Sequence, residues 1–224
     1  MNRKQPKIGT YKQETVSGIR KNNPGLQSLL KFWGRYCELT LWHEAWARQR
    51  IKVIPVRRGD VLSWTGDRQK MVYFVCKGIL ARVTETEVKD QTKRQITSIA
   101  MPGLALTSTT HLYRSTPHEG NIIALRSGIV VAIPYKTIKA YKEIEPTVET
   151  LIDILVNKKK RQVETHLQIL HPTSAFQRYI LFDTLLPEIR NATSQKEQAD
   201  FLGISRDTVQ KAQKFLLKPK TGLK

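Results

Sequence analysis

Arginine, lysine and amide side chains are concentrated near the end of the chain, between residues 206 and 214. Arg206, Gln210 and Lys214 are spaced four positions apart, which places them on one face of a helix. Such a face can bind DNA, because arginine can donate two hydrogen bonds to guanine and a carboxylate can accept one from cytosine. We therefore expect the segment to contact DNA. The candidate DNA-binding residues are Gln195, Ser205, Arg206, Asp207, Thr208, Gln210, Lys211 and Lys214.

Two short helices are predicted to position this polar face. Ser194 and Glu197 form an S-x-x-E capping box, which predicts the start of the first helix. Gly203 suits the left-handed position after that helix, and Ser205 can cap the next one. Small and apolar residues at helical spacing are expected to face inward: Ala199, Leu202, Val209, Ala212 and Leu216. The pattern is typical of a helix-turn-helix, whose second helix lies in the major groove. An ordinary helical hairpin with a solvated polar face is the alternative.

The charge of the chain favours an anionic partner. Its 224 residues carry 38 Lys and Arg against 19 Asp and Glu, a formal net charge of +19. Nucleic acid, an anionic membrane surface and an acidic protein are the partner classes that such an excess favours. The first 21 residues contain no apolar core of a leader peptide, and no later run reaches the ~20 apolar residues of a membrane span. We therefore expect a cytoplasmic protein that does not bind a membrane.

The periodicity of apolar residues divides the chain into four segments. Residues 1–25 are expected to be a flexible basic segment, and residues 26–146 a sensor domain that begins with two amphipathic helices. Within that domain, residues 51–134 contain seven short apolar runs separated by turns, which predicts many short strands in a sandwich, jelly roll or barrel. Gly78 is expected to separate two of these strands. Residues 147–171 form a long helix, and residues 172–224 the DNA-binding domain, including a third helix from the segment SAFQRYILFDTLLPEI.

The long helix carries a continuous apolar stripe that predicts packing against another helix, such as that of a second copy. The stripe contains Val148, Leu151, Ile152, Leu155, Val156, Val163, Leu167 and Leu170. The helix should end at His171-Pro172, because the residue before proline is pushed out of the helical conformation. Residues 147–171 are therefore a candidate contact between two copies of the chain.

The sequence resembles the superfamily of bacterial transcription regulators that contains the cyclic-AMP receptor protein and FNR. The segment SQKEQADFLGISRDTVQKA is similar to the helix-turn-helix of that family. The segments RRGDVLSWTGDRQKMVYFVCKGILARV, AMPGLAL and NIIALRSGIVVAIP resemble its cyclic-nucleotide-binding jelly roll. The resemblance covers roughly residues 40–217 and implies an α+β fold: N-terminal helices and a jelly roll, a dimerisation helix, and a three-helix DNA-binding domain with little or no wing. It also implies that Arg206, Asp207 and Lys211 contact bases.

The resemblance implies an effector pocket in the jelly roll, but the residues that bind cyclic AMP differ. The family's Gly-Glu pair for the ribose falls on Gly103-Leu104, and its arginine for the cyclic phosphate falls on His118. Leucine accepts no hydrogen bond and histidine is only partly charged at neutral pH, so we expect no cyclic AMP and name no cofactor. The candidate pocket residues are Gly103, Leu104, Ala105, Thr107, Arg114, Thr116, His118 and Glu119. A solvated loop without a ligand is the alternative.

Catalysis is not expected. A metal enzyme with this barrel would use histidines on neighbouring strands, yet the five histidines include no H-x-H pair. The two cysteines lack C-x-x-C spacing. We therefore predict a homodimeric, sequence-specific transcription regulator that binds double-stranded DNA and is not an enzyme. A small-molecule effector and RNA polymerase are further partners implied by the resemblance. The alternative is a ligand-sensing module that acts through protein contacts.

Overall fold

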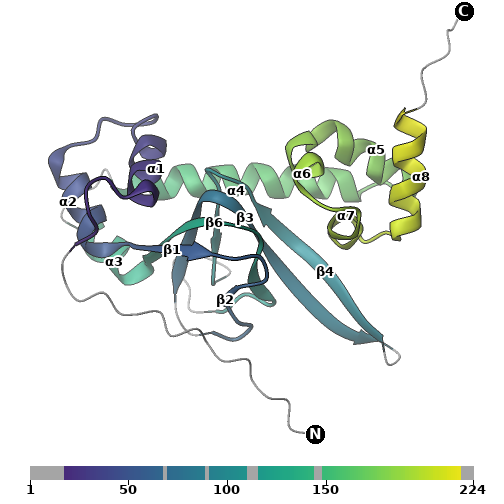
Figure 1. Ribbon diagram of the computed structural model, residues 1–224, viewed down its shortest axis with the longest axis horizontal. Helices are drawn as coiled ribbons and strands as arrows, with labels where there is room; N and C mark the ends of the chain where they lie inside the picture. Colours follow the sequence, from purple (N-terminus) through teal and green to yellow (C-terminus); the bar gives the residue numbers. More distant parts are fainter. Residues whose placement is uncertain (1–17, 68–69, 89–90, 110–115, 144–147, 218–224) are drawn as a thin grey trace, which may run out of the picture.

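The computed structural model describes residues 18–67, 70–88, 91–109, 116–143 and 148–217. Two helices precede the sheet, as the sequence predicts: α1 (Pro24–Trp33) and α2 (Leu41–Arg50). Asn23 caps α1 by accepting hydrogen bonds from the amides of Gly25 and Leu26. The two helices lie at one end of the molecule and the C-terminal helices at the other (Figure 1).

A six-stranded antiparallel sheet, curved into the jelly roll expected from the sequence, forms the centre of the molecule. The strands are β1 (Lys52–Val56), β2 (Val61–Ser63), β3 (Met71–Val88), β4 (Gln91–Ala100), β5 (Ala105–Thr107) and β6 (Asn121–Pro134). Their order is β1-β6-β3-β4, with β2 paired to β6 and β5 paired to β3. The seven apolar runs do not each form a separate strand: β3 and β6 each contain two of them, and β5 lies outside the predicted runs.

Gly78 bends β3 and does not end it, contrary to the sequence prediction. Its φ of +91° is a conformation that favours glycine, and the pairing of β3 with β6 shifts register beside it. A Cβ at this position would lie 2.8 Å from the carbonyl oxygen of Arg126 on β6. The bend therefore depends on the absence of a side chain.

The helix α4 (Val148–Leu170) follows the short helix α3 (Tyr135–Lys142) and ends before His171-Pro172, as predicted. Part of its apolar stripe is buried and part is exposed. Leu151, Ile152 and Leu155 are buried in a core shared with α1, α2 and the sheet. Three apolar residues farther along α4 remain largely exposed in this single chain: Val156 at 46%, Val163 at 43% and Leu167 at 62%.

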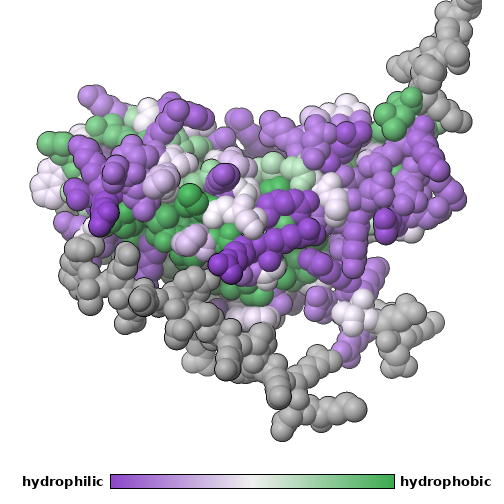
Figure 2. Space-filling view, in the orientation of Figure 1, coloured by the Kyte–Doolittle hydropathy of each residue, from purple (hydrophilic) through white to green (hydrophobic). Residues whose placement is uncertain are grey.

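Four helices form the C-terminal part: α5 (Ala175–Leu185), α6 (Pro187–Ala192), α7 (Gln195–Leu202) and α8 (Arg206–Leu217). Pro187 starts α6, so the predicted third helix is divided into two. One apolar core joins these helices to the sheet, because Tyr179, Phe182 and Phe201 share it with Ile79 and Ile96. The surface over α5 to α8 is mostly hydrophilic, with apolar surface near the end of α8 (Figure 2). Residues 218–224, where a wing was not expected, lie outside the described residues.

Within the described part of the chain, no helix is both long and apolar enough to cross a membrane. The same residues contain no group of three or more His, Cys, Asp and Glu side chains that could bind a metal ion.

Candidate nucleic-acid interface and its contact with the sheet

The start and end of α7 have the local geometry that the sequence predicts. The Ser194 hydroxyl accepts from the amide of Glu197 at 3.3 Å, and the Glu197 carboxylate accepts from the amide of Ser194 at 2.8 Å. Gly203 ends the helix with φ +64° and ψ +35°, the left-handed conformation. The amide of Ile204 then donates to the Ala199 carbonyl at 3.2 Å. The capping box and the glycine turn are confirmed.

The helix α8 is held against α7 by part of the predicted apolar face. Ser205 caps α8 by accepting from the amide of Thr208 at 3.1 Å. Val209 and Ala212 are fully buried, as predicted. Leu216 is 37% exposed, so its predicted inward position is wrong; Phe215 instead packs edge-to-face on Phe176 of α5.

The predicted DNA-binding residues fall into exposed and half-buried groups. Arg206, Asp207, Lys211 and Lys214 are exposed on α8, and Ser205 is exposed in the turn before it. The Lys211 ammonium lies 2.7 Å from the Asp207 carboxylate, and this hydrogen bond raises the pKa of Lys211. Among the described residues, Arg206 and Lys214 form no ion pair. These two exposed cations lie on α8 before and after the ion pair of Asp207 and Lys211.

Gln195, Gln210 and Thr208 are half-buried. Gln210 donates to the side-chain oxygen of Gln195 at 3.2 Å, and Gln195 donates to that of Gln213 at 2.7 Å. Gln213 in turn donates to the Tyr179 hydroxyl at 2.9 Å. Sequence reasoning missed this chain of amides, since Gln213 has no property of its own that distinguishes it from a solvated residue. These hydrogen bonds link α7 and α8 to each other and to α5.

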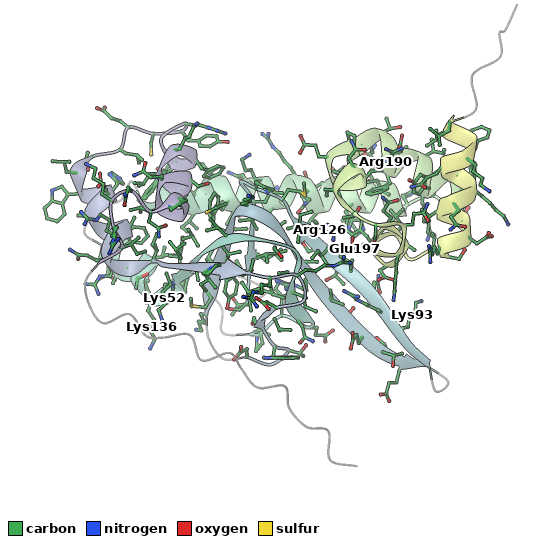
Figure 3. All side chains as sticks on the ribbon, viewed as in Figure 1. Lys52, Lys93, Arg126, Lys136, Arg190 and Glu197 are labelled. Atoms are coloured by element: carbon green, nitrogen blue, oxygen red, sulfur yellow. The ribbon has the colours of Figure 1, made fainter. Side chains whose placement is uncertain are left out.

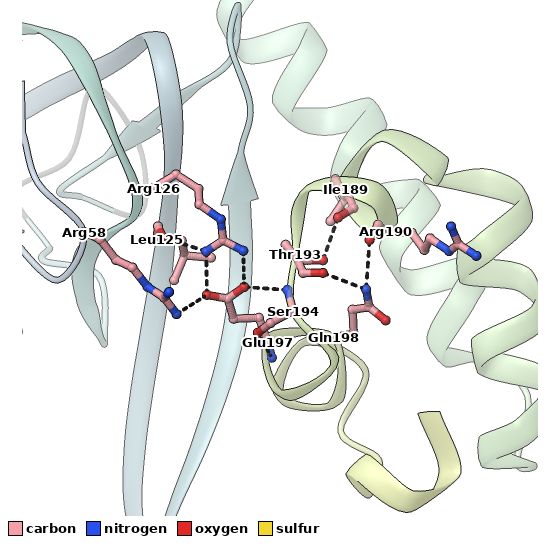
Figure 4. Close-up of polar contacts among 9 residues, drawn as sticks. All are labelled: Arg58, Leu125, Arg126, Ile189, Arg190, Thr193, Ser194, Glu197 and Gln198. Carbon is pink, nitrogen blue, oxygen red and sulfur yellow. Dashed lines mark hydrogen bonds and ion pairs between the residues drawn. The ribbon is translucent and has the colours of Figure 1, made fainter. Parts of the chain in front are cut away.

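A carboxylate at the start of α7 is bound by the sheet. Arg126 of β6 donates from its two terminal nitrogens to the two oxygens of Glu197, at 2.8 and 2.7 Å (Figures 3 and 4). Arg58 lies 3.5 Å from the same carboxylate. Burial would raise the pKa of Glu197, but the hydrogen bonds from Arg126 and Ser194 outweigh it, so the pKa is lowered. Glu197 is therefore a buried anion that connects two parts of the molecule.

Further contacts hold α7 between the sheet and α4. Asp200 lies 3.9 Å from Arg94 of β4, beside an open cleft that both residues line. The ring of His166 on α4 stacks on Phe201 with centroids 4.0 Å apart, and its Nε2 lies 3.1 Å from the Phe201 carbonyl. Burial lowers the pKa of His166. The first helix of the turn is thus fixed from two sides in this structure.

The structure describes seven of the eight residues of the predicted effector pocket. Gly103 sits in a turn with φ +83°, Leu104 and Ala105 are half-buried, and Thr116 and Glu119 are exposed. Two predicted positions do come together, because the amide of His118 donates to the Ser108 carbonyl beside Thr107. Arg114 lies outside the described residues.

Two basic residues that the sequence did not single out lie close to each other, and one of them contacts Thr107. The guanidinium of Arg82 on β3 donates to the Thr107 carbonyl at 2.5 Å. Lys159 of α4 donates to the hydroxyl of Ser98 on β4 at 2.5 Å, and Ser98 is paired with Arg82 across the sheet. Only the pairing of β3 with β4 and the packing of α4 bring these side chains together.

No protein-family model matches the sequence, and the search of curated proteins found no match. Solved structures with the same fold include FixK2 from Bradyrhizobium japonicum, at 19% identity and a TM-score of 0.60, covering 74% of this chain and 84% of that one. The global regulator CLP of Xanthomonas campestris matches at 15% identity and a TM-score of 0.59, over 75% and 86% of the two chains. A transcriptional regulator of the crp/fnr family from Eubacterium rectale matches at 14% identity and a TM-score of 0.61, covering 83% of this chain and 87% of that one. The chain has the fold of these regulators.

Proposed function

We propose that the chain is a sequence-specific DNA-binding transcription regulator and that it acts as a homodimer. The observation that carries the proposal is the exposed face of α8, with Arg206 and Lys214 standing free on a helix that Gly203 and the capping box position. Arginine and lysine on such a helix suit base edges and phosphates in the major groove. The shared fold with crp/fnr regulators supports the same function.

The homodimer in the proposal would use the exposed part of α4. Val156, Val163 and Leu167 expose apolar side chains along one helix, and the same helix of a second copy would cover them. Two copies related by a two-fold axis would present two α8 helices to a palindromic site, with half-sites about one helical turn apart.

Control by an effector is the third element of the proposal. The ion pair between Arg126 and Glu197 joins the sheet directly to the start of α7, so a change in the sheet would reach the helix pair that carries the DNA-binding face. CLP of Xanthomonas campestris is a c-di-GMP responsive regulator, which supports a ligand-controlled use of the fold. RNA polymerase is a further proposed partner.

A second function, docking of a protein by the C-terminal helices, is favoured by the exposed apolar end of α8 at Phe215 and Leu217. The salt dependence of binding distinguishes DNA binding from protein docking. DNA affinity measured from about 50 to 200 mM salt should fall steeply, because each contacted phosphate releases a counterion. An affinity for duplex DNA that stays constant over this range, or no affinity at all, would refute the DNA-binding function.

A further inference from the structure

Arg82 is a buried cation whose hydrogen-bonding capacity is largely unused. The residue is 3% exposed. Its Nη2 donates to the Thr107 carbonyl, whereas its Nε and Nη1 are buried and have no hydrogen-bond partner. Buried polar groups in proteins nearly always have a partner, because an unsatisfied one costs about 1–3 kcal/mol, and more when it is charged. The guanidinium therefore has donors available for an acceptor that the described part of the chain does not supply.

Lys159 brings a second positive charge to the same place. Its ammonium is largely withdrawn from solvent and donates to Ser98, the residue paired with Arg82. Burial and the charge of Arg82 lower the pKa of Lys159 to about 8, and burial lowers that of Arg82 to about 10. Among the described residues, neither cation forms an ion pair with a carboxylate. Two like charges thus share a buried site without a counter-charge.

We propose that Arg82, Lys159 and Ser98 form a binding site for a small molecule that carries a phosphate or similar oxyanion group. An arginine fork and an ammonium are the donors that proteins use for phosphate, and the Ser98 hydroxyl can add a further hydrogen bond. The three residues differ from Leu104 and His118, the positions that the family resemblance indicates for the ligand. The inference names the ligand class of the effector site in the proposed function and rests on that function only for its regulatory consequence.

The bound oxyanion would join the sheet to the proposed dimerisation helix. Arg82 and Ser98 belong to β3 and β4, while Lys159 lies on α4 between the exposed residues Val156 and Val163. Neutralising the two cations would remove their repulsion and stabilise the packing of α4 on the sheet. The site is therefore placed where a ligand can influence how two copies associate.

The test is calorimetric titration of the full-length protein with inorganic phosphate, at constant pH and ionic strength, in the absence of DNA. Arg82→Met and Lys159→Met should each weaken phosphate binding about tenfold or more, since each removes a charged donor. Lys160→Met is the matched control, because it removes the same charge from the next, exposed residue of α4 and should change the affinity less than about twofold. Equal affinities in the wild type and all three variants, or no binding to the wild type, would overturn the proposal.

Thermal unfolding without phosphate provides a second measurement. An unpaired buried charge destabilises the free protein, so Arg82→Met and Lys159→Met should melt at the wild-type temperature or higher. A marked loss of stability in both variants, with no phosphate effect on the wild type, would mean that the cations only support the fold. Lys159→Met keeps the test valid if Arg82→Met does not fold. A titration with ribose 5-phosphate distinguishes two kinds of ligand. Tighter binding than inorganic phosphate indicates an organic phosphate ester, and equal binding indicates the free phosphate ion. Because the titrations contain no DNA, their failure leaves the DNA-binding proposal intact.

Discussion

Arg126 of β6 and the Glu197 carboxylate of α7 form a two-point ion pair with distances of 2.8 and 2.7 Å. The same Glu197 oxygen that accepts from Arg126 at 2.7 Å also accepts from the amide of Ser194 in the capping box. One carboxylate therefore both starts the first helix of the turn and attaches it to the sheet. This shared use gives the sheet a direct mechanical connection to the candidate DNA-binding face.

Arg126→Met removes the attachment and leaves the capping box in place. We expect the free energy of unfolding, measured by urea denaturation, to fall by about 1–3 kcal/mol, because Glu197 is left as a largely buried anion. Hydrogen exchange should also rise in residues 195–202. Arg58→Met is the control: Arg58 is 68% exposed, lies 3.5 Å from the carboxylate, and should contribute about 0.5 kcal/mol or less. Similar losses in both variants would contradict the account of the ion pair.

The contact between His166 and Phe201 should make stability depend on pH near neutrality. Burial lowers the pKa of His166 below its ordinary value of 6.5, so the unfolded chain takes up a proton more readily than the folded one. Stability should therefore decrease as the pH falls through 6.5 towards the folded-state pKa, and stay constant above 6.5 as far as this residue is concerned. His166→Phe keeps a ring on Phe201 and should remove that part of the dependence.

Melting temperatures between pH 5 and pH 8 would measure the effect, with His171→Gln as a control because His171 is exposed after the end of α4. The control should follow the wild-type curve. A His166→Phe curve with the same slope as the wild type would show that the proton is taken up elsewhere.

Capping and spacing rules, which use residues close together in the sequence, were sufficient to predict α7 and α8. The features that these rules missed depend on contacts between distant residues. The capping box and Gly203 depend on residues within one turn of helix, so α7 and its end were predictable. The continuous strands β3 and β6 were not, because the pairing of their halves across Gly78 holds each strand together despite the bend. Leu216 was assigned inward from helical spacing, but it is 37% exposed in the last turn of α8.

The contacts of the candidate site could be predicted from the sequence even less well than the fold. Arg126 and Glu197 are 71 residues apart, and Arg82 is brought to Lys159 only by the packing of α4 on the sheet. No spacing rule connects such pairs. The assignments of Arg206, Asp207, Lys211 and Lys214 to DNA contacts remain predictions, although their exposure on α8 agrees with them.

The exposed stripe on α4 should determine the oligomeric state. Val163→Glu places a charge in the proposed contact between two copies, where burial without a partner is costly. We expect the dimer dissociation constant from sedimentation equilibrium to rise about tenfold or more, equivalent to about 1.4 kcal/mol.

Gln168→Glu introduces the same charge on an exposed residue next to Leu167 and should leave the dissociation constant within about twofold of wild type. A wild-type protein that is monomeric at micromolar concentration, or a Val163→Glu variant that dimerises normally, would exclude this surface as the dimer contact.

The most direct test of the central claim is selection of a random duplex library on the purified protein at physiological salt, with Arg206→Ala and Lys214→Ala in parallel. The account predicts an enriched inverted repeat with half-sites about one helical turn apart. Arg206→Ala should cost about 1–3 kcal/mol and relax the preference at one base pair of each half-site. Lys214→Ala should weaken binding to all duplexes about equally, as a phosphate contact does. Binding without any enriched sequence, or equal losses on selected and random duplexes for Arg206→Ala, would contradict sequence recognition by α8.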